Sequence, residues 1–395
     1  MTEVFLIGGA RTPIGRYGGA LASVRPDDLA ALVVRNAVTR AGVPDEAIDE
    51  VILGAANQAG EDNRNVARMA VLLAGLPDDV PGITVNRLCA SGMSAIAMAA
   101  QAIRAGDADV MVAGGVESMT RAPWVQAKPE RAWGKPGDAF DTSIGWRFAN
   151  PRLAARDKAT FSMPETAEEV ARRDGISRED ADAFALRSQQ RAIDAIDAGR
   201  FAAEIVAVPT RTGEVAVDEG PRRDTSLEAL AALRPVVAGG SVVTAGNSSS
   251  LNDGASAIVV ASAEAVRRYG LVPRARIVTA TSAALAPEIM GLGPVPATEK
   301  ALQRAGLGIA DIGAVELNEA FATQSLASIR RLGLDSEIVN RDGGAIALGH
   351  PLGSSGCRIV VTLLGRIERE NARRGLATMC VGVGQGTAMI VERVL

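Results

Sequence analysis

The sequence predicts an α/β fold built from two similar halves, with a further region inserted between them. Short apolar runs alternate with longer segments that have helical apolar spacing, a pattern typical of parallel sheets covered by helices. Glycine accounts for 42 of the 395 residues and gathers where strands meet helices. The pattern of the first part of the chain also returns near its end.

The first half is expected to alternate between strands and helices. These elements are predicted, in chain order, at residues 4–8, 29–41, 51–53, 94–105 and 110–113. Gly42 and Gly106 directly follow the two helical segments, where glycine commonly ends a helix. Later strands are expected at residues 257–260, 314–317 and 387–391.

An internal repeat links the two halves. Several residues at 40–53 return at 304–317, at a constant offset of 264 positions. Chance similarity among common residues is one explanation, but the matching order and context favour a duplicated unit. In open α/β sheets, ligands gather at the carboxyl ends of the strands. Duplication would therefore bring Cys89 and His350 from equivalent ends of two sheets to one place.

The region between the halves differs in character. Residues 121–246 contain all three tryptophans, several prolines and a charged helical pattern at 165–198, where Ser177 is expected to cap a second helix. We predict an N-terminal half from residues 1–120 and 247–270, an inserted loop domain at 121–246, and a C-terminal half at 271–395. Insertions of this kind often carry substrate specificity.

Composition and charge exclude several classes of protein. A formal net charge of −4 gives no sign of the basic surface that nucleic-acid binding requires. No apolar run approaches the ~20 residues that cross a bilayer, and the chain start lacks the features of a secretory signal, so no membrane span is expected. Three widely spaced cysteines indicate a reducing compartment, which we take to be the cytoplasm. A single histidine argues against a zinc site, and no metal is expected.

Cys89 is a candidate nucleophile. It lies between an apolar strand and a helix, so backbone N–H groups and the positive end of the helix dipole are expected to favour its thiolate. The alternative is a buried structural cysteine, which is the commoner role of a lone cysteine.

His350 is a candidate base. It is the only histidine of the chain and lies among four glycines at 343–353, which allow close approach of the backbone. A neutral imidazole beside a thiol can accept its proton. The alternative is a loop histidine whose hydrogen bonds are satisfied and whose role is structural.

Cys380 lies where a predicted strand meets a glycine-rich turn that contains Gly382. A cysteine there can exchange a proton with a substrate, and backbone N–H groups of the turn can hold an oxyanion. A dinucleotide-binding loop is a weak alternative, because a strand rather than a helix is expected after the turn. Cys357, within a predicted helix, is expected to serve packing.

Two polar segments complete the set of candidates. Asn318 follows the predicted strand 314–317. It can be a site residue at the carboxyl end of that strand, a helix cap, or both. Residues 245–254 form a polar loop that contains glycine, and an ordinary turn is the alternative interpretation.

These motifs resemble those of thiolases, in the same order along the chain. The segments that carry the resemblance are 86–92 around Cys89, 318–322 (Asn-Glu-Ala-Phe-Ala), 349–353 (Gly-His-Pro-Leu-Gly) and 380–384 (Cys-Val-Gly-Val-Gly). The resemblance runs from residue 11 to the end. It implies two thiolase-fold halves in a five-layered αβαβα core, a loop domain that binds coenzyme A, and a homotetramer or homodimer.

The resemblance also implies a mechanism. Cys89 would attack a 3-oxoacyl-CoA after giving its proton to His350, and Cys380 would protonate the departing enolate of acetyl-CoA. His350 with a water held by Asn318, and the N–H groups of Cys89 and Gly382, would bind the two oxyanions. Coenzyme A is then a substrate, with no covalently bound cofactor and no metal.

Coenzyme A contacts follow from motif positions in the same resemblance. The residues that it assigns to the coenzyme A pocket are Met163, Arg222, Ala245, Ser249 and Phe321. For Arg222, a solvated surface charge is an equal alternative.

The motifs also bear on the identity of the acyl substrate. Many acetoacetyl-type thiolases carry a histidine where this chain has Ser162, whereas residues 140–148 and 162–168 look more like those of 3-oxoadipyl-CoA thiolases. We therefore expect 3-oxoadipyl-CoA, with Arg147 or Arg152 as the partner of its distal carboxylate. An acetoacetyl-CoA thiolase and a general fatty-acid β-oxidation thiolase are the alternatives.

Three other classes compete with this interpretation. A decarboxylating ketoacyl synthase shares the fold, but the Cys380 motif speaks against it. A non-catalytic protein that binds coenzyme A or lipid would not need Cys89, His350 and Cys380 together. A nicotinamide oxidoreductase is the rival at the level of the fold.

Overall fold

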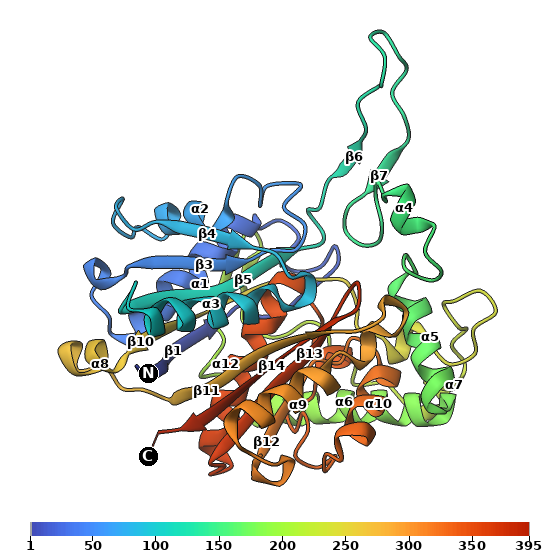
Figure 1. Cartoon of the computed structure of the whole chain (residues 1–395). Helices are drawn as coiled ribbons and strands as arrows, with labels where there is room; N and C mark the ends of the chain where they lie inside the picture. Colours follow the sequence, from blue (N-terminus) through green and yellow to red (C-terminus); the bar gives the residue numbers. More distant parts are fainter. Residues whose placement is uncertain (1, 395) are drawn as a thin grey trace.

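Hydrogen bonds join ten strands into one sheet, in the order β12-β13-β14-β11-β1-β10-β5-β3-β4 with β2 paired to β10 (Figure 1). The computed structural model describes residues 2–394; Met1 and Leu395, the outer ends of the predicted domain ranges, lie outside it. The strands are β1 (Val4–Arg11), β2 (Gly15–Arg16), β3 (Glu50–Gly54), β4 (Gly82–Val85), β5 (Val110–Ser118), β10 (Asn252–Ser262), β11 (Ala275–Ala284), β12 (Ala314–Leu317), β13 (Arg374–Val381) and β14 (Gln385–Arg393).

The two halves of this sheet lie one above the other, with helices between them and on both outer faces. The helices are α1 (Pro26–Ala41), α2 (Val66–Leu73), α3 (Ser91–Ala105), α4 (Pro151–Ala154), α5 (Met163–Asp174), α6 (Arg178–Asp197), α7 (Leu227–Ala231), α8 (Ala263–Tyr269), α9 (Pro294–Ala305), α10 (Ala322–Leu332), α11 (Ala345–Leu348) and α12 (Leu352–Arg369). Helices α3 and α12 pack against each other between the halves, α1 and α2 cover one outer face, and α9 and α10 cover the other. The predicted five-layered α/β architecture is therefore confirmed.

Alternating burial explains why the strands form these layers. In β3, Val51 and Leu53 pack with α1 and α2, whereas Ile52 between them packs into the central core. The same alternation in β5 sends Val112 outward to α1 and Met111 inward to α3 and α12. Because side chains alternate along a strand, one buried apolar strand serves two helical layers.

The repeat predicted from the sequence corresponds to equivalent elements. Strands β3 and β12 occupy the repeated segments, and each pairs in parallel with a following strand, β5 or β13. Val339, the counterpart of the β4 end, forms an isolated parallel bridge with Val315. The helix ends at Gly42 (φ 67°) and Gly106 (φ 88°) are left-handed, as expected.

The parallel strand pairs that were expected are present, but the sheet as a whole is mixed. Pairs β3–β4, β3–β5 and β12–β13 are parallel, but β1, β10, β11 and β14 pair antiparallel with their neighbours. The reason is the length of the connections: β13 and β14 are joined by the short turn at residues 382–384, too short for a parallel crossover. The strand predicted at 110–113 also continues through Gly114 and Gly115 to Ser118.

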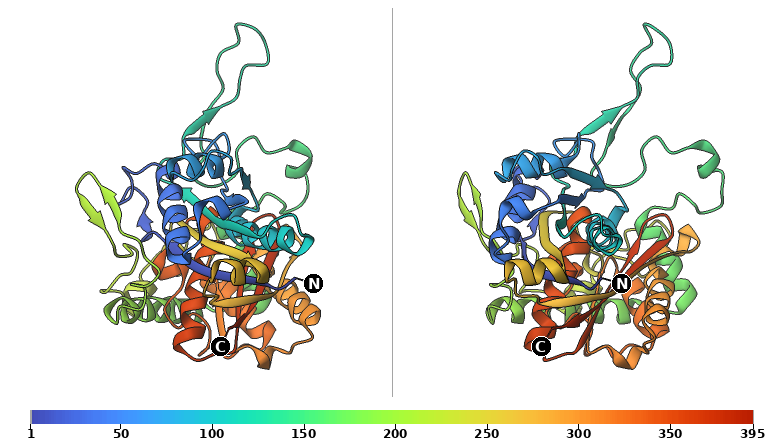
Figure 2. Two further views of the ribbon diagram at one scale, coloured as in Figure 1. Left: turned by 90° about the vertical axis from the view of Figure 1, so that its left-hand side faces the viewer. Right: turned by 60° about the vertical axis from the view of Figure 1, so that its left-hand side comes forward.

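The inserted region lies between β5 and β10. It contains α4 to α7 and a 3-10 turn at Ala245–Asn247. It also contains two hairpins, β6 (Trp124–Gln126) with β7 (Ala139–Asp141) and β8 (Val208–Thr210) with β9 (Gly213–Val215). The connection between β6 and β7 stands away from the body of the molecule in all views (Figures 1 and 2), and Trp133 in it is fully exposed. Ser177 caps α6 through its side chain, as predicted.

One helical stretch, Leu88–Ala105, is long and apolar enough to span a bilayer by length and composition alone. It consists of a 3-10 turn (Leu88–Ala90) and α3, and it packs between the two sheet halves. Core helices satisfy the same criterion, so this stretch is weak evidence for a span.

Glycines let the central helices touch backbone to backbone. A Cβ atom on Gly356 of α12 would lie 2.4 Å from the backbone nitrogen of Met93 in α3, and one on Gly92 would lie 2.7 Å from the carbonyl oxygen of Gly353. No real Cβ contact is this short, so α3 and α12 can approach only where glycine stands.

We predict that Gly356→Ala destabilises the protein, although alanine is the better helix former by about 1 kcal/mol. Overpacking against Met93 should outweigh that gain and lower the free energy of unfolding by about 1–3 kcal/mol. Gly365→Ala in the same helix is the matched control, because its Cβ would meet only the flexible end of Arg369. Thermal unfolding followed by circular dichroism measures both. Equal melting temperatures for the two variants would contradict the packing argument.

Candidate active site

Cys89 is presented by a strained turn at the start of α3. Leu88, just before it, has a positive φ of 48°, a rare conformation for a branched side chain. The side chain of Asn86 holds this turn, because its Oδ1 accepts a hydrogen bond of 2.8 Å from the N–H of Leu88. Cys89 itself is half-buried. The turn therefore fixes the thiol at the end of the central layer.

His350 lies in the loop between α11 and α12, the counterpart position in the second half. Its N–H donates to Oδ1 of Asn252 at 2.9 Å, and the left-handed Gly349 leaves room for that amide. The ring is buried, with Nε2 at 3.4 Å from Nδ2 of Asn318 and Nδ1 at 2.7 Å from Oγ of Ser355. Contacts on both nitrogens thus orient the imidazole.

Cys380 lies near the carboxyl end of β13, where it is buried. Its thiol donates to Oε1 of Gln324 at 2.8 Å. The turn that follows contains Gly382, with Val383 (φ 62°) and Gly384 (φ 73°) in the left-handed region. The N–H of Gly382 lies within hydrogen-bonding reach of the Cys89 sulfur. The turn therefore points a backbone donor at the candidate nucleophile.

A cavity of about 230 Å³ brings these groups together. The predicted site residues that line it are Cys89, His350, Cys380, Met163, Ala245, Ser249 and Phe321. Asn318 stands behind His350, and its Oδ1 has no hydrogen-bond partner in the described part of the chain. The polar loop at 245–254 is therefore part of the cavity wall. Asn318 does not cap a helix, because α10 begins after Phe321.

Burial keeps the three reactive groups neutral. Desolvation raises the pKa of Cys89 to about 11, although the N–H groups of Gly382 and of Cys89 itself lower it. Burial also raises the pKa of Cys380, helped by the nearby Cys89. Desolvation lowers the pKa of His350 to about 3, and the positive charge of Arg358 adds to this.

Burial opposes the stabilisation of a Cys89 thiolate that was expected from the helix N-terminus. Loss of hydration disfavours the thiolate more than the backbone donors favour it. The site holds a neutral thiol beside a neutral imidazole. Ionisation of Cys89 then requires transfer of its proton to His350 in the course of the reaction.

Not every predicted residue lies in this cavity. Arg222 is exposed; its backbone N–H donates to Gln189, and it does not line the cavity. Arg152 is exposed at the start of α4, where its backbone N–H donates to Asn150. Arg147 is half-buried and donates to Oδ1 of Asn57 at 2.8 Å. Ser162 shares a capping box with Glu165 at the start of α5.

Several residues around the site were missed by the sequence analysis. These residues are Ser355, Gln324 and Asn252, described above, and Glu117, whose buried carboxylate accepts backbone hydrogen bonds from Ala56, Asn57 and Gly353. Glu117 thus ties the end of β3 to the start of α12. Burial raises its pKa to about 7. Gln324 and Ser355 had a local signal, since each follows a recognised motif by a few residues, and Asn252 lies within the polar loop at 245–254.

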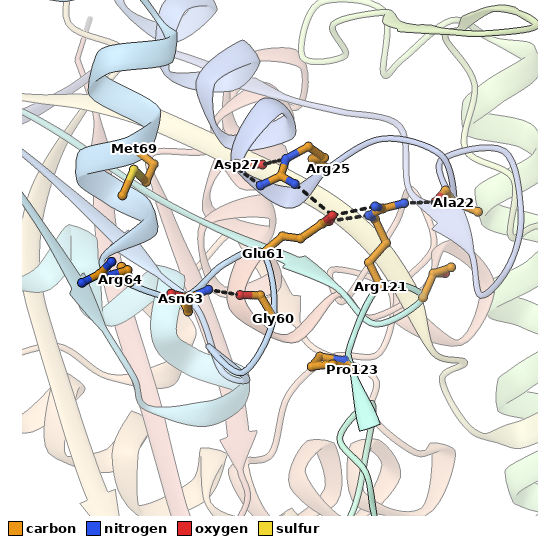
Figure 3. Close-up of a pocket in the computed structure, with 11 residues that line it drawn as sticks. Ala22, Arg25, Asp27, Gly60, Glu61, Asn63, Arg64, Met69, Arg121 and Pro123 are labelled. Atoms are coloured by element: carbon orange, nitrogen blue, oxygen red, sulfur yellow. Dashed lines mark hydrogen bonds and ion pairs between the residues drawn. The ribbon is translucent and has the colours of Figure 1, made fainter. Parts of the chain in front are cut away.

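A second hollow of the surface, about 670 Å³ in volume, contains none of the predicted site residues. Figure 3 shows Glu61 between Arg25 and Arg121, with a distance of 3.0 Å to Arg25. Arg25 also pairs with Asp27 at 2.9 Å. Because these charges neutralise one another, size alone does not make this hollow a site of chemistry.

Metal ligands are not grouped within residues 2–394: no three His, Cys, Asp or Glu side chains lie together as an ion would need. The groups that the cavity and its surroundings present for chemistry are thiols, an imidazole, an amide and backbone N–H groups.

Comparison with known proteins identifies relatives of this arrangement. The family model described as "Thiolase, N-terminal domain" matches residues 4–264, and "Thiolase, C-terminal domain" matches residues 271–393. A "Beta-ketoadipyl-CoA thiolase" of Pseudomonas aeruginosa is 58% identical over 399 residues and covers 99% of each chain. A "3-oxoadipyl-CoA/3-oxo-5,6-dehydrosuberyl-CoA thiolase" of Escherichia coli K12 is 56% identical over the full length of both chains. The solved structure of human mitochondrial 3-ketoacyl-CoA thiolase in complex with CoA superposes with a TM-score of 0.94 at 39% identity, covering 100% of this chain and 98% of that one.

We predict that alkylation of Cys89 by iodoacetamide accelerates about tenfold per pH unit from about pH 7 to about pH 10, because the thiolate fraction rises up to the raised pKa. Intact-protein mass spectrometry follows the rate, with Cys89→Ala as the blank for the other cysteines. A plateau that begins below about pH 8 would show a thiolate already formed in the resting protein, contrary to the burial argument.

Proposed function

This chain belongs to the thiolase family, and we propose that its substrate is a 3-oxoacyl-CoA whose acyl chain ends in a carboxylate, namely 3-oxoadipyl-CoA. As an acyltransferase of this family, it cleaves a 3-oxoacyl-CoA with coenzyme A to acetyl-CoA and a shortened acyl-CoA. The observation that carries the mechanism is the meeting of Cys89, His350 and Cys380 in one cavity.

In the first half-reaction, Cys89 forms a covalent intermediate. Its sulfur attacks the 3-keto carbon while its proton passes to Nε2 of His350. The bond between C2 and C3 then breaks, which leaves the acyl group on the sulfur. The enolate of acetyl-CoA takes the proton of the Cys380 thiol. A buried thiol suits this step, because it keeps its proton until a strong base forms beside it.

The second half-reaction regenerates the site. The Cys380 thiolate accepts the proton of a new coenzyme A thiol, whose sulfur attacks the acyl-enzyme. The acyl group moves to coenzyme A, and Cys89 leaves with the proton that His350 stored. Two covalent steps replace one difficult exchange, so one nucleophile and two proton carriers suffice.

Two sets of hydrogen-bond donors can hold the oxyanions. The N–H groups of Cys89 and Gly382 face the thioester side, and His350 with the Asn318 amide faces the enolate side. Removing one such donor costs about 3–4 kcal/mol in other enzymes. Leu88 and Val383, both at positive φ, hold the backbone donors in place.

Coenzyme A is a substrate that we place against the inserted region. Ser249, Ala245, Met163 and Phe321 all line the cavity, whose small volume suits a narrow pantetheine arm. Arg222, exposed and outside the cavity, is then left for the nucleotide end of the molecule.

Arg147 is the better of the two candidates for the distal carboxylate. Ile144, on the same loop, lines the cavity. The guanidinium of Arg147 donates a hydrogen bond to the neutral side-chain amide of Asn57. Among the ion pairs of residues 2–394, none joins Arg147 to a carboxylate. A half-buried guanidinium without a counter-charge can bind a substrate carboxylate in bidentate geometry. Arg152 is exposed on α4, further along the chain from Ile144.

Assembly and location are further parts of the proposal. We propose a homotetramer or homodimer in the cytoplasm; Trp124 and Trp133, both exposed on the projecting β6–β7 hairpin, support a contact with another subunit. Light scattering coupled to gel filtration measures the assembly.

We predict that Arg147→Ala lowers kcat/KM for 3-oxoadipyl-CoA about tenfold to a hundredfold, because a charge-assisted pair is lost. Cleavage of acetoacetyl-CoA, which has no distal carboxylate, should change little. Arg152→Ala is the matched control and should leave both substrates unaffected. Spectrophotometric thiolysis of both substrates gives the comparison.

An unchanged ratio between the two substrates in Arg147→Ala would remove Arg147 from carboxylate recognition. A wild-type protein that prefers acetoacetyl-CoA or a medium-chain 3-oxoacyl-CoA would remove the dicarboxylic substrate itself and favour the acetoacetyl-CoA or β-oxidation alternatives.

We predict that Cys380→Ala separates acyl transfer from carbon–carbon bond chemistry. The cleavage rate should fall about 10²- to 10⁴-fold, because the acid for the enolate is gone. Acetyl-CoA should still acetylate Cys89, although more slowly, because a coenzyme A thiolate is a much weaker base than an enolate and can leave without the Cys380 proton. The product is detectable as an added acetyl group by mass spectrometry and is absent in Cys89→Ala. Loss of both activities in a folded Cys380→Ala protein would contradict this division of roles.

A further inference from the structure

We propose that Ser355 fixes the tautomer of His350, so that the ring hydrogen sits on Nδ1 and Nε2 is free to accept the proton of Cys89. Ser355 is thus a positioning residue, which acts on the substrate only through His350. The inference rests on the proposed role of His350 as the base and is independent of the acyl substrate.

The hydroxyl of Ser355 has two neighbours and one hydrogen. Ser355 lies in the first turn of α12, with Oγ at 2.7 Å from Nδ1 of His350 and at 2.9 Å from the carbonyl oxygen of Pro351. The carbonyl can only accept, so the hydroxyl donates its hydrogen there. Oγ is then the acceptor toward the ring, and Nδ1 must carry the hydrogen.

The other face of the ring agrees with this assignment. Nε2 lies 3.4 Å from Nδ2 of Asn318, which is a donor, and it faces the cavity that contains the Cys89 thiol. In the opposite tautomer, Nε2 would carry a hydrogen toward the donor Nδ2 of Asn318 and have no lone pair for the Cys89 proton. Only the Nδ1–H form presents a base to the nucleophile.

Ser355 also suits the charged ring that forms during the reaction. Once Nε2 has taken the proton, both ring nitrogens carry hydrogens. Nδ1–H keeps its acceptor in Ser355, while Nε2–H becomes a donor for the substrate oxyanion. The same Ser355 contact therefore serves the resting and the protonated ring.

Other charged or titratable groups near the ring do not supply this contact. Cys89 and Cys380 lie across the cavity, and Arg358 on α12 opposes a positive ring. Glu117 is held by backbone N–H groups, including that of Gly353, and Glu319 beside Asn318 is held by Ser188 and Asn340. Among the described residues, only the Ser355 hydroxyl is bonded to Nδ1.

A single histidine makes the proposal directly measurable. The chain contains one imidazole, so protein made with ¹⁵N-labelled histidine and purified without a histidine tag gives the signals of His350 alone. The ¹⁵N shifts distinguish a protonated from an unprotonated ring nitrogen. They are recorded on the full-length resting protein without substrate, so the result does not depend on the acyl specificity.

Ser355→Ala, Ser355→Thr and Ser354→Ala form the variant set. Ser354 is the matched control: it is the adjacent serine of α12, equally buried, but its hydroxyl lies 2.9 Å from that of Ser256 and is not bonded to the ring. Ser355→Thr keeps the hydroxyl. Kinetics of thiolysis accompany the spectra of each variant.

We expect the wild type and Ser354→Ala to show a neutral ring with the hydrogen on Nδ1. Ser355→Ala should show both tautomers, with kcat lowered about tenfold to a hundredfold and KM little changed. Ser355→Thr should restore both the spectrum and kcat. A wild-type ring with its hydrogen on Nε2 would overturn the proposal, even if no variant folds.

An unchanged Nδ1–H spectrum in folded Ser355→Ala would equally overturn it, because another group would then fix the ring. Failure of the proposed mechanism has a different signature: a His350→Gln protein with full thiolase activity would remove the base, whatever the tautomer of the wild-type ring.

Discussion

Close contact between the first turns of α3 and α12 is the constraint on which the rest of the structure depends. Gly92 and Gly356 leave no room for a Cβ atom at this contact, a Cβ on Gly353 would collide with Val116 of β5, and one on Gly54 would collide with Ser91. Because the backbones touch, the residues just before the two helices, Cys89 and His350, open into one cavity although they lie far apart in the chain. Larger residues would separate the helices and the two reactive groups with them.

The same packing sets the electrostatics of the site. Water is excluded from the buried ring of His350 and from most of the Cys89 thiol, so neutral forms of both are favoured. A charge pair would be expensive before substrate arrives. Charge therefore forms only when a proton moves between them, beside backbone donors already in place at Gly382. In a dry cavity these fixed dipoles act more strongly than water would.

Duplication explains why one cavity holds such different groups. The equivalent strands β5 and β13 both end beside the central helices. In the second half this end carries Cys380 and Gly382, which face the substrate. In the first half it carries Glu117, whose carboxylate binds three N–H groups from two segments and holds the His350 loop against β3. One copy of the unit thus supplies chemistry and the other supplies rigidity.

The sequence by itself determined the layers, the repeat and the reactive side chains, because apolar spacing, glycine caps and the motifs around Cys89, His350 and Cys380 are local patterns. Tertiary structure decided what depends on distant segments. It set the antiparallel strands, since strand direction follows from which strands pair, and it added the burial that raises the pKa of Cys89. It alone placed the hydroxyl of Ser355 against Nδ1 of His350, and it alone showed that Arg147 is half-buried and bonded to Asn57 whereas Arg152 is exposed. Such hydrogen bonds depend on ångström distances that spacing in a chain does not encode.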